Sequence, residues 1–94
     1  MYKAELVRLE DRTVQVYFYD QAMNPLPLSN FAKTGKGILE VIKKQKTTRT
    51  PFDLALEGDA FTGKAPKARS KPFNIDVTVQ EGTRKLLAAF DNLD

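Results

Sequence analysis

Hydrophobic and polar residues alternate with a period of two over most of the chain, which is the pattern of β-strands with one buried face. The clearest example is the segment TVQVYFY, in which almost every residue is β-branched or aromatic. The period places Val14, Val16 and Phe18 on one face, which we predict to be part of the core. It places Tyr17 and Tyr19 on the opposite face, where their amphipathic rings can lie at a surface.

Seven segments carry such strand signals, and turn-forming residues separate them at nearly regular intervals. We predict strands at Tyr2–Leu9, Val14–Tyr19, Ile38–Lys44, Arg49–Glu57, Ala60–Ala65, Phe73–Gln80 and Thr83–Phe90. The region Ser29–Gly37 is predicted to be a connection in which Phe31 closes one end of the core, and 45–48 is predicted to be a polar hairpin tip.

This pattern predicts an all-β fold of about seven short strands, an immunoglobulin-like or Greek-key β-sandwich. Two alternatives stay open. The same strands fit a small β-barrel, and residues 83–93 also fit the apolar stripe of a helix. The 94 residues show no internal repeat or linker, so we predict a single domain over residues 1–94.

Composition excludes several kinds of chemistry. The chain has no cysteine and no histidine, which excludes disulfides, thiolate nucleophiles, Cys-ligated metals and a histidine base. Its only serines, Ser29 and Ser70, lie in predicted loops without a base, and carboxylate pairs such as Glu57 and Asp59 lie at predicted turns, where they are solvated. We therefore expect a protein that is not an enzyme and that has no cofactor and no metal site.

Targeting signals are also missing from the sequence. It contains no apolar stretch of the ~18–20 residues that cross a membrane, so we expect no membrane insertion. The first residues lack the basic and apolar regions of a signal peptide. The chain therefore fits either a cytoplasmic protein or a mature exported domain whose signal has been removed.

Positive charge is concentrated in the middle of the chain. The net charge is +3, but residues 33–71 carry +6 and the remainder carries −3. The candidate residues for binding a polyanion such as nucleic acid are Lys43, Lys44, Lys46, Arg49, Lys64, Lys67, Arg69 and Lys71. The alternative is that these residues solvate hairpin tips and protect edge strands.

A second candidate surface follows the strand at residues 14–19. The loop Asp20–Leu28 begins with a residue that caps turns and is stiffened by two prolines. We predict that this loop and the outward tyrosines bind a protein partner, through Tyr17, Tyr19, Asp20, Met23, Asn24 and Pro25. A third possibility is a structural or subunit role through edge pairing of the first strand.

Four motifs together resemble a known class of proteins. They are Val14–Asp20, Asn24–Pro27, Gly58–Gly63 and Phe73–Val79. The sequence resembles small periplasmic β-sandwich proteins associated with bacterial heavy-metal efflux systems and, more loosely, YtkA-like domains. Members of this class often carry a histidine- or glycine-rich lead, which this sequence lacks, so no metal ligand is carried over. The resemblance implies a periplasmic location and a non-catalytic binding or accessory role in the bacterial envelope, linked to metal efflux or resistance.

Overall fold

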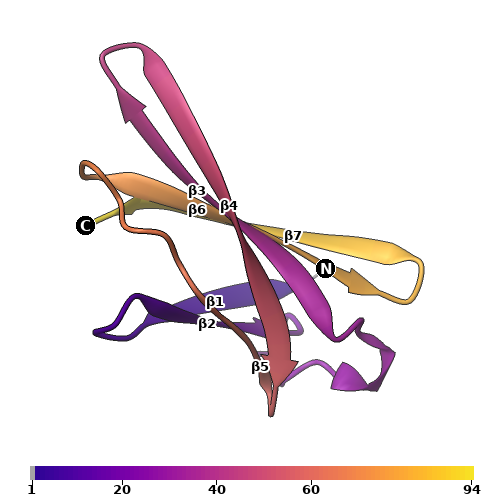
Figure 1. Cartoon of the computed structure of the whole chain (residues 1–94). Helices are drawn as coiled ribbons and strands as arrows, with labels where there is room; N and C mark the ends of the chain where they lie inside the picture. The colour runs from indigo at the N-terminus through magenta and orange to yellow at the C-terminus, as the bar shows by residue number, and fades with distance from the viewer. Residues whose placement is uncertain (1) are drawn as a thin grey trace.

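The chain folds into seven antiparallel strands of a single sheet in a computed structural model that describes residues 2–94 (Figure 1). The strands are β1 (Lys3–Arg8), β2 (Thr13–Tyr19), β3 (Thr34–Lys43), β4 (Lys46–Glu57), β5 (Ala60–Lys64), β6 (Phe73–Glu81) and β7 (Arg84–Leu93). A short 3-10 helix, η1 (Leu28–Asn30), lies between β2 and β3. The all-β class and the seven strands are confirmed. No helix within residues 2–94 has the length and apolar character needed to cross a membrane.

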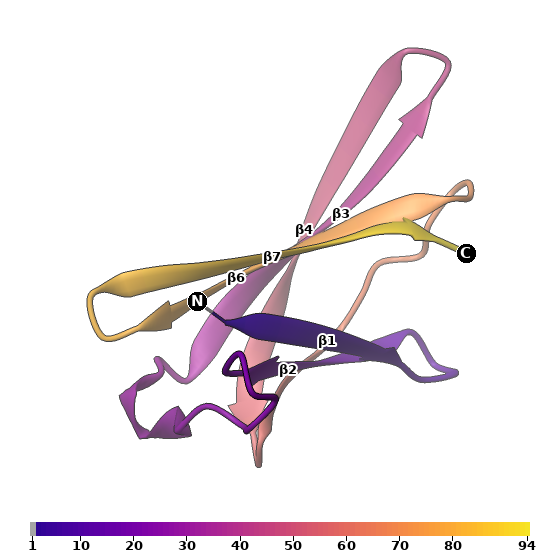
Figure 2. The ribbon, with the colours of Figure 1, turned by 180° about the vertical axis from the view of Figure 1, so that it is seen from behind.

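The strands follow the order β1-β2-β5-β4-β3-β6-β7, and every neighbouring pair is antiparallel. The sheet coils until β1 and β7 approach each other, so it is barrel-like and nearly closed (Figures 1 and 2). Because the number of strands is odd, β1 and β7 run in the same direction. No backbone ladder joins them within the described chain. Tyr2 bridges this seam: its hydroxyl donates to the Leu87 carbonyl at 2.7 Å and accepts from the Leu87 N–H at 2.6 Å.

The predicted sandwich is corrected to the barrel alternative, because the strands form one coiled sheet and not two stacked sheets. Alternation shows which residues point inward, and it is the same in both architectures. Inward-facing glycines allow the tight coiling. The ring of Phe52 covers Gly37, where an added Cβ would lie 2.4 Å from Cζ of Phe52. At Gly63 an added Cβ would lie 2.2 Å from the carbonyl oxygen of Asp53.

The core confirms the predicted inward face of β2. Val14, Val16 and Phe18 are buried, and Phe61 of β5 is fully buried beside them. Phe18 packs edge-on against Phe61 with ring centroids 6.1 Å apart, the arrangement that aromatic quadrupoles favour. Phe31 is also buried against these rings, so its predicted place at the end of the core is confirmed.

Three features of the structure differ from the predicted elements or decide between predicted alternatives. The segment 83–93 is not a helix: Thr83 lies in the turn and residues 84–93 form β7, which pairs with β6 from Glu81 opposite Arg84. β3 begins at Thr34, so part of the predicted connection is a strand. The tip of the β3–β4 hairpin contains only Lys44 and Gln45, both with positive φ. Two-residue hairpin turns favour glycine, asparagine or aspartate at such positions, so this turn had no recognisable sequence signal.

Candidate polyanion-binding groove

The long β3–β4 hairpin carries one side of a basic groove. Figures 1 and 2 show its paired ends projecting beyond the rest of the sheet. The tight turn places Lys43 directly opposite Lys46, and Thr48 and Thr50 continue the same face of β4 because side chains alternate along a strand. The β5–β6 loop lines the groove from the other side. This basic groove has a volume of about 450 Å³ and contains the cations Lys43, Lys44, Lys46, Lys67 and Arg69.

The floor and walls of the basic groove suit an anionic ligand. Leu39 and Val41 form an apolar floor, and both are buried. The hydroxyls of Thr48, Thr50 and Ser70 also line it, and hydroxyls are common donors to phosphate. No carboxylate is among the lining residues. Within residues 2–94, none of the five cations forms an ion pair. The groove therefore presents unneutralised positive charge.

Three of the predicted basic residues lie elsewhere. Arg49 is one residue out of phase with Thr48 and Thr50, so it lies on the outer face, where it pairs with Glu40 and, at 3.6 Å, with Asp76. Lys64 ends β5 opposite Thr13, on the outer face. Lys71 lines a different cavity, at the end of the barrel. The structure thus brings five of the eight predicted residues together.

The three hydroxyl residues of the basic groove were missed by the sequence interpretation. The sequence predicts that Thr48 lies in a polar hairpin tip, where side-chain direction is undefined. Once the strand starts at Lys46, a two-residue period places Thr48 and Thr50 on the same face as that lysine. Ser70 lies in a loop, and nothing in its sequence neighbourhood indicates that the loop approaches β3 and β4.

The two predicted partner-binding tyrosines lie on the outer face of β2, where both are half-buried. The Tyr19 hydroxyl donates to the Glu5 carboxylate at 3.1 Å, and the Tyr17 hydroxyl contacts the Gln15 side chain at 3.5 Å. Partial burial, followed by the hydrogen bond to Glu5 and its negative charge, raises the pKa of Tyr19 above its ordinary value of 10.0. The ionised form of Tyr19 is therefore disfavoured relative to a free tyrosine.

The loop after β2 is capped by the side chain of Asp20. The Asp20 carboxylate accepts hydrogen bonds from the N–H groups of Ala22 and Asn24, both at 2.9 Å. Pro25 bridges back to β2 opposite Tyr19. Met23 has a φ of 66° and is 54% exposed at the tip. The structure thus places the predicted partner-binding residues at one corner of the molecule.

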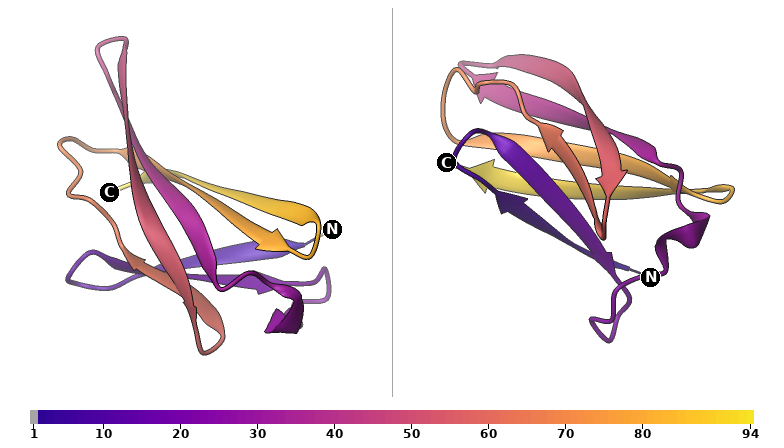
Figure 3. Two further views of the ribbon diagram at one scale, coloured as in Figure 1. Left: turned by 45° about the vertical axis from the view of Figure 1, so that its right-hand side comes forward. Right: turned by 60° about the horizontal axis from the view of Figure 1, so that its bottom comes forward.

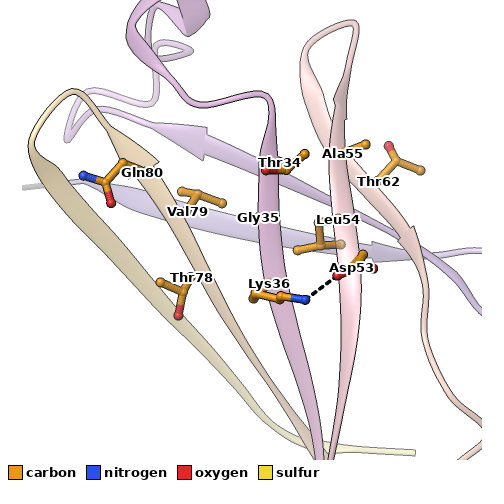
Figure 4. Close-up of a pocket in the computed structure, with 10 residues that line it drawn as sticks. All are labelled: Thr34, Gly35, Lys36, Asp53, Leu54, Ala55, Thr62, Thr78, Val79 and Gln80. Atoms are coloured by element: carbon orange, nitrogen blue, oxygen red, sulfur yellow. Dashed lines mark hydrogen bonds and ion pairs between the residues drawn. The ribbon is translucent and has the colours of Figure 1, made fainter.

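A wider hollow of about 760 Å³ lies over β3 and β4 on the outer face of the sheet (Figure 4). Lys36 and Asp53 form an ion pair across it, so their charges compensate each other. Its other polar side chains are Thr34, Thr62, Thr78 and Gln80. This hollow has no excess charge, and its residues are those of an ordinary exposed sheet face.

Neither a metal site nor a similarity to known proteins indicates a function for this chain. In the part of the chain that the structure describes, no three carboxylates lie close enough together to hold a metal ion. No protein-family model, curated protein or solved structure gave a significant match to the chain.

Proposed function

We propose that this protein is a non-catalytic domain that binds a polyanion in its basic groove. The observation that carries the proposal is the convergence of five cations from two distant segments, the β3–β4 hairpin and the β5–β6 loop, around a groove with no carboxylate. Lysines that served only to solvate a hairpin tip would not need to share one face of the hairpin. Here Lys43 and Lys46 share one face, which costs stability because like charges opposite each other on paired strands repel.

Binding would proceed through charge and hydroxyl contacts. Each anionic group that the basic groove neutralises releases counterions, so affinity falls as salt rises. Single-strand binders usually add aromatic side chains on which bases stack. No aromatic residue lines this groove, and Phe52 and Phe61 are buried in the core. An oligonucleotide would therefore bind through its phosphates, without base preference, as inorganic polyphosphate would.

The test is a charge-neutralised triple variant, Lys43→Gln, Lys44→Gln and Lys46→Gln, titrated with inorganic polyphosphate over a series of salt concentrations. For single strands the slope of log affinity against log salt is about −0.7 per contact. We expect the three substitutions to reduce the magnitude of that slope by about 2, and to weaken binding more than about tenfold at low salt. Isothermal titration calorimetry measures both quantities.

A matched control separates the basic groove from net charge. Lys3, Lys33 and Lys85 are exposed and do not line the groove. Changing all three to glutamine removes the same charge, and we expect it to change polyphosphate affinity much less. Equal losses in the two triple variants would show that binding follows net charge, and the proposed groove function would be abandoned.

The envelope accessory role implied by the resemblance remains a prediction. Its surface would be the corner formed by Tyr19 and the Asp20 turn, which is held by two hydrogen bonds and exposes Met23. Rigid surfaces that present an exposed side chain suit protein docking, because little ordering is required on binding. Cell fractionation tests the location: recovery in the cytoplasmic fraction would contradict it.

A further inference from the structure

A separate cavity opens at one end of the barrel. It lies between the β1–β2 turn, the β5–β6 loop, the start of β6 and the end of the described chain, which Figure 3 shows gathered at the same end. This end cavity has a volume of about 560 Å³, within the range of small-molecule sites. Its floor is apolar: Val14 and Ile75 are 1% exposed, and Ala65 is also buried.

The rim of the end cavity is mainly positive. Four cations, Arg8, Arg12, Lys67 and Lys71, face two carboxylate residues, Glu10 and Asp94. The Arg8 guanidinium donates to the Asp94 carbonyl at 2.9 Å and lies 5.6 Å from the centroid of the Phe73 ring, so it is held at the edge of the apolar floor. Within residues 2–94 the other three cations form no ion pair.

Backbone hydrogen bonds fix the walls of the end cavity. The Ala65 N–H donates to the Arg12 carbonyl at 3.0 Å, which ties the β5–β6 loop to the β1–β2 turn. The Leu9 N–H donates to the Thr13 carbonyl at 2.8 Å and closes that turn. The site is therefore formed before any ligand arrives, as small-molecule sites usually are.

We propose that the end cavity binds an amphipathic anion, namely a carboxylate that carries a single aliphatic chain. The aliphatic chain would lie against Leu9, Ala68 and Phe73, the lining residues that keep exposed apolar surface above buried Val14 and Ile75. The carboxylate would meet the free rim cations Arg12 and Lys71. A polyanion has no apolar body for this floor, and a neutral hydrocarbon would leave the cations without a partner. The inference is independent of the proposed function, since only Lys67 lines both the end cavity and the basic groove.

The test uses decanoate, below its micelle concentration, with the whole chain. We expect decanoate to shift the amide resonances of Val14, Ala65 and Ile75, and to bind at least about tenfold more tightly than decanol or acetate, which each lack one of its two features. We expect the double variant Arg12→Gln and Lys71→Gln to weaken decanoate binding about tenfold or more. Lys64→Gln removes a cation that does not line the end cavity, and it should leave decanoate affinity unchanged.

A second variant blocks the floor and leaves the charges in place. Ala68 lines the end cavity and is half-buried, so Ala68→Phe fills space that the aliphatic chain would occupy. We expect Ala68→Phe to abolish decanoate binding while the double charge variant keeps the native amide spectrum. The proposal is overturned if decanol binds as well as decanoate, or if the double charge variant leaves decanoate affinity unchanged. It is equally overturned if phosphatidylglycerol vesicles bind the protein and monomeric decanoate does not, since that result would indicate a membrane-surface contact.

The groove triple variant distinguishes this site from the proposed function. Lys43, Lys44 and Lys46 do not line the end cavity, so their neutralisation should leave decanoate affinity unchanged. Loss of polyphosphate binding together with unchanged decanoate binding would show two separate sites.

Discussion

At the residue scale, Gly63 shows how closely two strands approach across this sheet. An added Cβ would lie 2.2 Å from the Asp53 carbonyl oxygen and 2.8 Å from Cδ2 of Leu54. The carbonyl belongs to the β4 backbone, so it moves only if the strand moves. We expect Gly63→Ala to lower the free energy of unfolding by about 1–3 kcal/mol, the usual cost of overpacking. Urea denaturation measures this change, with Thr62→Ala on the same strand as control. If Gly63→Ala lowers the free energy of unfolding by less than about 0.5 kcal/mol, the close approach is contradicted.

A second prediction at this scale concerns the raised pKa of Tyr19. Partial burial and the Glu5 carboxylate favour the neutral phenol in the folded state. This contribution to stability is fully present below the ordinary value of 10.0 and is lost as the pH rises through the folded pKa. We expect an NMR titration of the Tyr19 ring to give a midpoint above that value, and Glu5→Gln to lower the midpoint. An unchanged midpoint in Glu5→Gln would show that Glu5 plays no part in the shift.

At the scale of the element, the β3–β4 hairpin decides where the positive charge points. Its two-residue turn sets the register, and the register places Lys43 opposite Lys46 on the face of the basic groove and Arg49 on the other face. A register shifted by one residue would exchange these faces. The expected loss of polyphosphate binding in the triple lysine variant is therefore a prediction about the element, because the hairpin brings Lys43, Lys44 and Lys46 to the same groove.

Strand positions were largely predictable at this scale, whereas turns were less so. The inward faces of β2 and β6 follow from alternation, and Val14, Val77 and Val79 are buried as expected. The sequence predicts the tip of β3–β4 at 45–48, but its exact two-residue turn was not predictable, since Lys44 and Gln45 adopt positive φ without the usual turn residues. The candidate site was predictable in part: charge clustering indicated the lysines, but its hydroxyls depended on the register of β4.

At the scale of the whole molecule, a side chain takes the place of a missing ladder. The Tyr2 hydroxyl makes two hydrogen bonds to Leu87 across the seam between β1 and β7. We expect Tyr2→Phe to lower the free energy of unfolding by about 0.5–1.5 kcal/mol and to speed hydrogen exchange at the Leu87 amide. Exchange at buried Val16, within the β1–β2 ladder, is the internal control. Unchanged exchange at Leu87 would show that the seam is held by other contacts.

The choice between sandwich and barrel also belongs to the whole molecule. Local alternation cannot report whether β5 pairs with β2 or with another strand, because that pairing joins segments more than forty residues apart, such as Val16 and Phe61. The sequence predicts that Gly37 ends a connection and that Gly63 lies in a short strand. Their role in coiling the sheet became visible only with their neighbours across the strands.

The shared direction of β1 and β7 has a mechanical consequence. Because both strands run the same way, β1 begins at one end of the barrel and β7 finishes at the other, where Figure 1 shows the two ends of the chain. A pulling force applied to Tyr2 and Asp94 would therefore act along the strand axes. It would load the hydrogen bonds of the β1–β2 and β6–β7 ladders together, in shear, and would not peel them apart one at a time. We therefore expect the unfolding force to be higher for pulling between Tyr2 and Asp94 than for a direction that peels one strand from the sheet, although the seam has no ladder.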